Sequence, residues 1–478
     1  MERPYRRRNP SPIEQLEARR LLSATYYVSV KGEDANAGTD PALPWRHIQK
    51  AFDAATPGST VNVLPGRYNE RLVLNVSGNA TDGFITFQAA PKVILSAKKV
   101  AGGADVISIN NRNYVRIIGF DIRDNLKVSN GSGIRLTEAN SFIEIRNNRI
   151  HNMTGANAMG ITVYGTEPTR GISNLVIDGN EIYKCQPARS EALVLNGNVH
   201  DFVVSNNYVH DVNNIGIDFI GGEGRSPDPS TDVARNGLVS SNRVTRARFR
   251  GGGRDAAGIF IDGAQDIVVE RNLVWRNDVG IEVNAIHAGR VATAVTVRDN
   301  VVLANNRAGI SIGGPDALGG SVQNCSFTNN TLYGDDVKRT GSGEIRILFG
   351  SNNVVENNVV YGRRGSLLMN VESSAGPNTS NYNVFFSPDG PARSRFTWSG
   401  VPLVGFAAFQ TAGGQDLASP FANPLLRRPT ALDVHLAATS PALNAGDPAF
   451  VASAGETDID AQPRLQGARV DIGADEAA

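Results

Sequence analysis

The feature that most constrains this chain is a short motif that returns at nearly even intervals. An Asn is followed by any residue and then by Ile, Val or Leu, and successive copies begin 27–35 residues apart. A period of 20–50 residues is typical of solenoids, in which each repeat packs on its neighbours. The eight copies begin at Asn148, Asn180, Asn207, Asn242, Asn272, Asn300, Asn330 and Asn358, and Phe120 fits one step earlier.

Within each repeat, apolar residues alternate with period two, as in strands, and not with the period of 3.6 of a helix. "DIVVERN" alternates up to the Asn, and "GIEVN" alternates after a Gly. Three short strands per repeat predict an all-β fold, a right-handed parallel β-helix of about 11–12 coils. The recurrent Asn should form a hydrogen-bonded ladder between coils. A propeller is excluded because its blades need about 40–45 residues.

The ends of the repeat suggest the domain organisation. Residues 58–386 hold the coils, and residues 25–57 form an N-terminal cap, because "WRHIQKAFDAA" at 45–55 spaces Trp45, Ile48, Phe52 and Ala55 as one face of an amphipathic helix. Residues 387–478 break the repeat and are expected to form an irregular C-terminal cap. Solenoids need such caps at both ends.

Composition excludes several classes of function. Lys and Arg number 47 and so do Asp and Glu, so zero net charge gives no reason to expect a nucleic-acid partner. No apolar run approaches the roughly 18 residues of a membrane span. Cys185 and Cys325 lie several coils apart, which predicts two free thiols. We expect a monomer.

Residues 1–24 form a basic segment without the apolar core of a standard signal peptide, and we expect it to be disordered. Within it, "LEARRLLSA" at 16–24 resembles the LEPR-x-LL motif, with Ala18 in place of the proline. That motif marks the N-termini of many exported bacterial proteins. The resemblance implies a secreted or cell-surface protein.

The stretch "YYVSVKGEDANAGTDPALPWRHIQKAFDAATPGSTVNVLPGRYNE" and the closing "DIGADE" resemble pectin-lyase-like β-helix proteins. This resemblance, which spans nearly the whole chain, implies the same fold. The superfamily includes polysaccharide lyases, glycoside hydrolases, epimerases and phage tailspikes. It therefore implies a polysaccharide or oligosaccharide ligand without choosing a reaction.

In this superfamily the strand that here begins with Gly-Ile usually forms the floor of the substrate groove. If the Ile points inward, the residues two and four places after the Gly face outward. Three acids, Asp218, Asp262 and Glu282, then lie close together on this face. The first outward column reads Arg135, Thr162, Val194, Asp218, Phe260, Glu282, Ser311 and Arg346, and the second reads Thr137, Tyr164, Asn196, Ile220, Asp262, Asn284 and Gly313.

Two long insertions flank the three acids, residues 222–236 and 245–257. Insertions in solenoids tend to gather on the binding face. The second insertion supplies Arg248, Arg250 and Arg254 as candidate substrate-binding residues. Further candidates for substrate binding are Asn196, Trp275, Asn284, His287 and Arg346.

A glycoside hydrolase is the first functional hypothesis, because it needs one ionised and one protonated carboxyl. An Asp followed by "EVN" on the next coil resembles β-helix enzymes of the β-xylosidase type. There the Asp is the nucleophile and the Glu the general acid. The resemblance implies these roles for Asp262 and Glu282. Asp218 is a third catalytic candidate from its place in the same column as Glu282, and under this hypothesis we expect no cofactor.

Two alternatives stay open. A polysaccharide lyase would hold Ca²⁺ with Asp218, Asp262 and Glu282, and Arg248, Arg250 or Arg254 would act as base or as uronate clamp. A non-catalytic glycan-binding or structural solenoid would instead use the aromatic column that contains Trp275. Rings in such a column also stack as ordinary packing.

Overall fold

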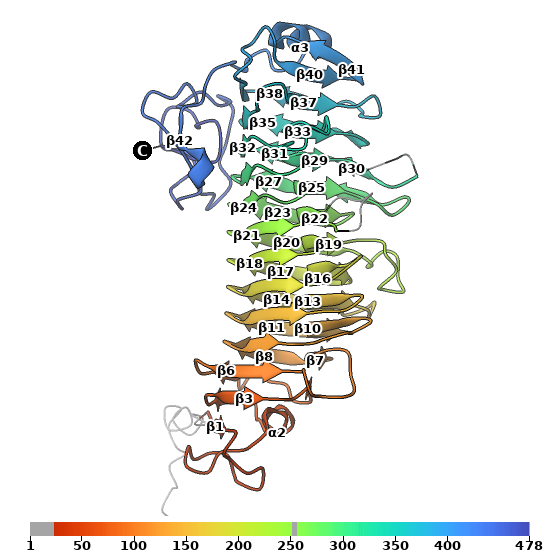
Figure 1. Ribbon diagram of the computed structural model, residues 1–478, viewed down its shortest axis with the longest axis vertical. Coiled ribbons are helices and arrows are strands. Elements are labelled where there is room, and N and C mark those ends of the chain that lie inside the picture. The colour runs from red at the N-terminus through yellow and green to blue at the C-terminus, as the bar shows by residue number, and fades with distance from the viewer. Residues whose placement is uncertain (1–22, 251–255, 315, 317, 478) are drawn as a thin grey trace, which may run out of the picture.

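The computed structural model describes residues 23–250, 256–314, 316 and 318–477. They form one long stack of coils, with the N-terminal cap at one end and helix α3 (Phe406–Gly413) at the other (Figure 1). Within these residues the strands build three long sheets of 16, 12 and 13 strands. Neighbouring coils pair in parallel throughout the stack, so the predicted parallel β-helix of about 12 coils is confirmed.

Sheet A is the first sheet of each coil. Its strands are β1 (Thr25–Val28), β2 (Thr60–Val63), β5 (Ile85–Ala89), β8 (Asn113–Ile118), β11 (Asn140–Arg146), β14 (Ile172–Asp178), β17 (Val199–Ser205), β20 (Ala234–Ser240), β23 (Gln265–Glu270), β26 (Val291–Thr293), β27 (Thr296–Arg298), β30 (Ser321–Gln323), β31 (Ser326–Thr328), β34 (Gly350–Ser351), β35 (Val354–Glu356) and β38 (Thr379–Asn381).

Sheet B follows the ladder Asn of each coil. Its strands are β3 (Gly66–Tyr68), β6 (Val93–Ser96), β9 (Asp121–Arg123), β12 (Arg149–Met153), β15 (Glu181–Cys185), β18 (Tyr208–Val212), β21 (Arg243–Ala247), β24 (Leu273–Trp275), β28 (Val301–Leu303), β32 (Thr331–Tyr333), β36 (Val359–Tyr361) and β39 (Val384–Phe386).

Sheet C contains the Gly-Ile strands. Its members are β4 (Leu72–Leu74), β7 (Ile107–Asn110), β10 (Gly131–Thr137), β13 (Ala158–Gly165), β16 (Glu191–Gly197), β19 (Ile215–Ile220), β22 (Ala257–Asp262), β25 (Val279–Asn284), β29 (Ile310–Ile312), β33 (Ile345–Ile347), β37 (Leu367–Val371), β40 (Arg395–Trp398) and β41 (Val401–Val404). All pair in parallel except β40 with β41, which is antiparallel.

The core is a column of Ile, Val, Leu and Phe side chains that point inward from all three sheets and are buried along the whole stack. At each corner between sheets A and B, the predicted asparagine ladder is present. The side-chain amide of each Asn donates to the side-chain oxygen of the next at 2.9–3.0 Å, from Asn148 through Asn358 to Asn383. Each such bond satisfies a buried polar group and fixes the register of two coils.

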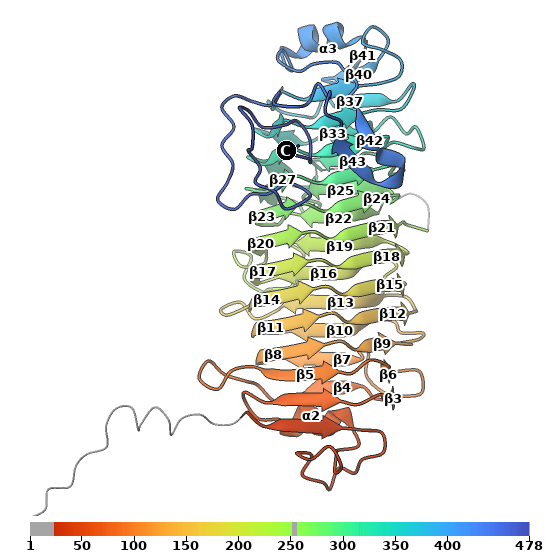
Figure 2. The same cartoon turned by 90° about the vertical axis from the view of Figure 1, so that its left-hand side faces the viewer.

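The first coil is closed by helix α2 (Ile48–Ala54), which lies at the lower end of the stack (Figure 2). Its Ile48, Ala51 and Phe52 side chains are buried against the first coils, and Trp45 and Ala55 flank it as buried residues. The expected amphipathic helix is therefore present, with its apolar face on the core. Among the described residues, no helix is both long enough and apolar enough to cross a membrane.

The C-terminal residues divide into two parts. Strands β40 and β41 with helix α3 close the last coil, and residues 423–477, here named the return segment, run back along the outside of the stack (Figure 1). The return segment contains the antiparallel pair β42 (Leu426–Arg428) and β43 (Asp433–Leu436), joined by the short helix η1 (Pro429–Ala431). It packs on the side, whereas the sequence suggested an end cap over all of 387–478.

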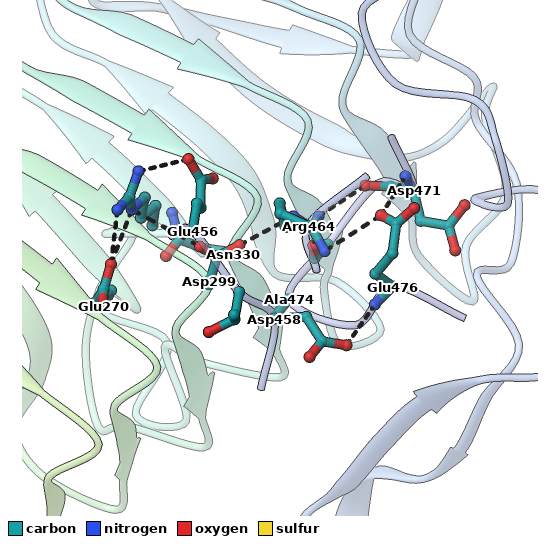
Figure 3. Close-up of polar contacts among 12 residues, drawn as sticks. Glu270, Asp299, Asn330, Glu456, Asp458, Arg464, Asp471, Ala474 and Glu476 are labelled. Atoms are coloured by element: carbon teal, nitrogen blue, oxygen red, sulfur yellow. Dashed lines mark hydrogen bonds and ion pairs between the residues drawn. The ribbon is translucent and has the colours of Figure 1, made fainter. Parts of the chain in front are cut away.

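Buried charges fasten the return segment to the coils (Figure 3). The Arg464 side chain is fully buried, and its Nε lies 3.1 Å from Asp299 Oδ1 on the coil. Arg298 bridges Glu270 and Glu456, with N···O distances of 2.8 and 2.6 Å. The Ala474 N–H donates to Thr331 Oγ1 at 2.9 Å. Cys185 and Cys325 are free and buried, as expected.

Candidate active site

The pairing of the Gly-Ile strands confirms the first outward column from Arg135 to Arg346, and the second column over Thr137–Ile220 and at Asp262 and Asn284. Asp218 pairs with Phe260, Phe260 pairs with Glu282, and Asp262 pairs with Asn284. Because neighbouring strands lie about 4.8 Å apart, Asp218 and Glu282 are separated by roughly 10 Å along the column. The sequence therefore located the three acids correctly relative to one another.

These residues line a groove of about 610 Å³ on sheet C, a size within the usual range for ligand sites. Its walls come from the turns before and after the strands of six consecutive coils. The lining residues are Arg189, Glu191, Asn214, Ile215, Asp218, Ile220, Glu223, Phe260, Asp262, Val279, Glu282, Asn284, Ile286, His287, Arg307, Ala308, Ser311, Gly313, Ser342, Arg346 and Leu348.

The three acids differ in burial. Asp218 and Asp262 are each only 1% exposed, while Glu282 is partly exposed. Burial raises the pKa of Asp262 to about 8, and the charges of Glu282 and Glu223 act in the same direction. Burial also raises the pKa of Asp218 well above its usual range, helped by Glu191 and Asp262. The groove thus holds protonated carboxyl groups at neutral pH.

Backbone groups orient the two carboxyls on adjacent coils. The Ala285 N–H donates to Asn284 Oδ1 at 2.6 Å, so the amide of Asn284 faces Glu282 and donates to its Oε1 at 3.2 Å. The Ile286 N–H donates to Asp262 Oδ1 at 2.7 Å. The other oxygen of Asp262 lies 3.9 Å from His287 Nε2. Glu282 is therefore held as an acceptor, and Asp262 keeps one oxygen toward His287.

Two further acids line the groove, Glu191, which the sequence places near it, and Glu223, which was not predicted. Glu191 begins strand β16, and burial with the nearby Glu223 and Asp262 raises its pKa to about 8. Glu223 lies on the first insertion, after strand β19, and accepts hydrogen bonds from Asn196 and Arg225. The insertion signalled a binding face, but no repeat pattern shows where a loop residue will point.

The first insertion is pinned over the groove edge by Arg290. Its Nη1 donates to the Pro229 carbonyl at 2.9 Å, and its Nη2 lies 3.9 Å from Asp232 Oδ2. Asp232 in turn accepts the N–H groups of Gly224 and Ser226 at 2.7 and 2.9 Å. From this folded loop Glu223 reaches the groove and lines it beside Asp218 and Asp262.

Some predicted substrate-binding residues lie elsewhere. Asn284, His287 and Arg346 line the groove, whereas Asn196 supports it from behind through Glu223. Arg248 donates to the Arg276 carbonyl at 2.9 Å, Arg250 is exposed, and neither lines the groove. Arg254 lies outside the described residues.

Trp275 is the clearest correction. It projects from sheet B, not from the groove, and is 8% exposed. The return segment covers it, because Trp275 packs in one apolar cluster with Val434 and Ala474. The Trp275 ring thus serves in packing, which is the alternative that the sequence analysis gave for rings of this column.

The groove acids do not form a compact cation site. In the described part of the chain, only one set of three candidate ligand groups brings its atoms within 4.8 Å of one another, namely His435, Asp460 and Asp475 of the return segment. Asp218, Asp262 and Glu282 form no such set. The geometry gives no support to Ca²⁺ bound by these three carboxyls together.

Comparison with known proteins is consistent with this architecture. The family model described as right-handed β-helix region matches residues 105–285 and 229–347. The uncharacterised protein YwoF of Bacillus subtilis (strain 168) is 34% identical over 434 residues, which cover 87% of this chain and 91% of YwoF.

Three solved structures share the fold at low identity. A GH136 lacto-N-biosidase from Eubacterium ramulus superposes with a TM-score of 0.52 and 15% identity, over 77% of this chain and 68% of that one. Pectate lyase Pel9A gives 0.51 and 15%, over 95% and 96%. XylC in complex with xylose gives 0.50 and 13%, over 76% and 83%. Together with the family model and the relationship to YwoF, these matches show that the chain belongs to the right-handed β-helix family.

Proposed function

We propose that this protein is a glycoside hydrolase whose reaction takes place in the groove on sheet C. The observation that carries the proposal is the pairing of unlike carboxyls on adjacent coils. Asp262 is buried, with its pKa raised to about 8, and Glu282 is partly exposed and held as an acceptor by Asn284. Hydrolysis of a glycosidic bond needs one carboxyl of each kind.

The charges assign the roles in the order opposite to the one that the β-xylosidase resemblance implies. Asp262 keeps its proton at neutral pH and donates it to the glycosidic oxygen as the bond to the anomeric carbon breaks. Glu282 either attacks that carbon to form a glycosyl ester, which water then hydrolyses, or takes a proton from the water that attacks the carbon directly. In either case the products are two sugars, one with a new reducing end.

The surrounding acids support this division. Asp218 and Glu191 lie in the same groove, and the pKa of each is raised by burial and by the neighbouring carboxyls, so the whole cluster disfavours loss of a proton. Asp218 Oδ1 is buried without a hydrogen-bond partner in the described residues, which leaves it available to a sugar hydroxyl.

Sugar-acting neighbours are compatible with the proposal. By their names, the solved neighbours include a lacto-N-biosidase, a pectate lyase and a protein bound to xylose. Identities of 13–15% carry no substrate across, so the groove itself is the argument. The export-like residues 16–24 lead us to propose that the protein acts outside the cell, as a monomer.

The test is a panel of polysaccharides and oligosaccharides assayed for new reducing ends and for ultraviolet absorbance of an unsaturated sugar, each with and without a chelator. We expect reducing ends without the absorbance, and no effect of the chelator. Unsaturated product that disappears with the chelator would show a lyase instead. Turnover should be lost in Asp262→Asn and in Glu282→Gln.

The matched control is Asp201→Asn. Asp201 is an exposed acid on sheet A whose backbone is left-handed (φ 54°), a conformation that Asn adopts readily. Its turnover should equal that of the unchanged chain. Binding of sugars without turnover of any of them would support the non-catalytic alternative and refute the hydrolase.

A further inference from the structure

A second hollow of about 450 Å³ lies on the same side of the molecule, nearer the C-terminal end of the stack. We name it the distal hollow. It is formed by the loop before β33, the start of β37, and the antiparallel strands β40 and β41. Its lining residues are Asp336, Arg339, Gly341, Gly365, Ser366, Leu367, Arg395, Phe396, Thr397, Pro402, Leu403 and Val404.

The distal hollow continues the groove. Gly341 lines the hollow and the next residue, Ser342, lines the groove, so one loop forms a wall of both. The outward column that holds Glu282 also passes through Arg346 in the groove and ends at Thr397 in the hollow. Four strand spacings separate Glu282 from Thr397, which is about 19 Å. A ligand that spans several sugar residues can therefore reach both.

The charge of the distal hollow is positive. Arg339 and Arg395 are exposed at its rim, and neither guanidinium group makes a hydrogen bond or an ion pair with any described residue. The one acid in the lining, Asp336, is occupied by its own loop, because it accepts the N–H groups of Thr340 at 2.7 Å and Gly341 at 3.0 Å. Two unpaired cations thus face the hollow.

The remaining lining is apolar on one side. Leu367, Pro402, Leu403 and Val404 supply carbon surface next to the arginines. The C–H face of a sugar ring packs on such a surface, while the planar fork of an arginine matches a carboxylate with two parallel hydrogen bonds. A sugar that carries a carboxylate satisfies both parts of the hollow.

The stretch between the two hollows carries unsatisfied polar groups as well. Arg346 Nε and Asn370 Oδ1 are neighbours in the column, and each is buried without a hydrogen-bond partner in the described part of the chain. Buried polar atoms of this kind are rare in folded proteins. They lie on the path from the groove to the distal hollow, where small side-chain movements would bring them to a polar ligand.

We propose that the distal hollow is a binding subsite for an acidic sugar, and that the ligand of the groove is a polyanionic polysaccharide that extends from the carboxyls toward α3. This inference rests on the proposed function only in taking the groove as the place of reaction. It names the substrate class, a polymer with uronate residues, and the direction in which the polymer lies.

The test compares four hexasaccharides by calorimetric titration of the full chain carrying Glu282→Gln, so that turnover does not consume the ligand. Two are anionic, the hexamers of galacturonate and of mannuronate, and two are neutral, xylohexaose and cellohexaose. We expect at least one uronate hexamer to bind more tightly than both neutral ones. Its Kd should rise roughly tenfold when Arg339→Gln and Arg395→Gln are added, and should also rise with salt.

Arg428→Gln is the matched control, because Arg428 is equally exposed but lies on the return segment. It should leave the Kd unchanged. The inference is wrong if neutral hexamers bind as tightly as the uronates, or if the double arginine variant binds as the parent does. Failure of the hydrolase proposal is read separately, because binding is measured without turnover and stays informative if Glu282 proves not to be catalytic.

Discussion

Two backbone N–H groups, those of Ala285 and Ile286, hold the groove side chains Asn284 and Asp262 in place. The first holds the Asn284 oxygen and so turns the amide nitrogen toward Glu282, and the second holds one oxygen of Asp262. Both follow directly from the way the chain turns after β25. The Ile286 N–H favours the charged form of Asp262, so it is burial, and not this hydrogen bond, that raises the pKa of Asp262.

The residue-scale prediction concerns pH. Asp262 must be protonated to act as the acid, and its pKa is raised to about 8. We therefore expect kcat/KM to be flat through pH 7 and to fall as the pH rises through about 8. A pH profile with a good substrate measures this, since kcat/KM reports the groups of the free enzyme.

The assigned role would be contradicted if kcat/KM already declined with rising pH at values below pH 6, since an Asp262 with an ordinary pKa would lose its proton there. The Asp201→Asn chain should reproduce the parent profile in full, because Asp201 lies on sheet A, away from the groove.

At the scale of elements, the ladder of asparagines is the main device that keeps coils in register. Asn272 shows the full set of bonds: its oxygen accepts from Asn242, and its amide donates to Asn300 and to the Val239 carbonyl. Every one of these groups is buried. Removal of one side chain therefore leaves several polar atoms without partners.

We predict that Asn272→Ala lowers the free energy of unfolding by about 3 kcal/mol, since each buried group left unsatisfied costs on the order of 1–3 kcal/mol. Urea unfolding followed by circular dichroism gives the value. Asn69→Ala, at an exposed position, should change it by less than about 0.5 kcal/mol. Equal effects of the two substitutions would show that the ladder contributes little.

A shorter ladder on the next corner ends in an acid. Asn277 donates to Asn305, and Asn305 donates to Asp335 Oδ1 at 2.8 Å. The other oxygen of Asp335 and one of Glu344 are both buried without partners. Burial raises the pKa of Asp335 to about 7, and burial and Asp335 raise that of Glu344 still more clearly. The folded chain keeps protons there that the unfolded chain releases above about pH 4.

Stability should accordingly fall as the pH rises from about 4 toward 7 and beyond, because a raised pKa in the folded state favours folding only while the group is protonated. Asp335→Asn keeps the oxygen that Asn305 needs and places an N–H donor beside Glu344. We predict a gain of about 1–3 kcal/mol at pH 8 and a weaker dependence on pH. Urea midpoints at pH 5 and pH 8 measure both, and a loss of stability at pH 8 would contradict the prediction.

The repeat allowed much of this to be predicted from the sequence. Period-two alternation located the Gly-Ile strands, and the pairing of Asp218, Phe260 and Glu282 follows from it directly. The repeat says nothing about residues outside it. Glu223 comes from an insertion, Arg248 from a turn whose direction the pattern does not encode, and Trp275 is covered by a segment that follows it by more than a hundred residues. These long-range contacts depend on tertiary packing.

At the scale of the whole molecule, the return segment ties the C-terminal part of the chain to the middle coils. Its anchor is Arg464, which is fully buried and reaches Asp299 at 3.1 Å and Glu476 at 3.6 Å. It also donates to the carbonyls of Asp471 and Gly473. The Arg464 side chain thus joins Asp299 on the coil to residues 471–476 of the return segment (Figure 3).

Arg464→Met should free the return segment while the coils stay folded. Loss of one partner of a buried ion pair costs about 3–5 kcal/mol, which is borne by the contacts of the segment. Limited proteolysis with mass spectrometry should show early cleavage within 423–477 and a protected fragment that ends near 422. Arg427 is an exposed residue of the same segment, and the Arg427→Met variant should be cut no faster than the parent chain. Uniform resistance of both variants would refute this role of Arg464.

The order in which a ribosome makes the chain gives the return segment a further meaning. The coils that carry Asp299, Thr331 and Asn357 are synthesised first and can stack as they emerge, each on the one before. Their partners in 447–474 are synthesised later. Until then Asp299 lacks Arg464 as its partner, and its face of the solenoid stays exposed to solvent. Coils that lack this segment are left with the flank around Asp299 and Thr331 open to solvent.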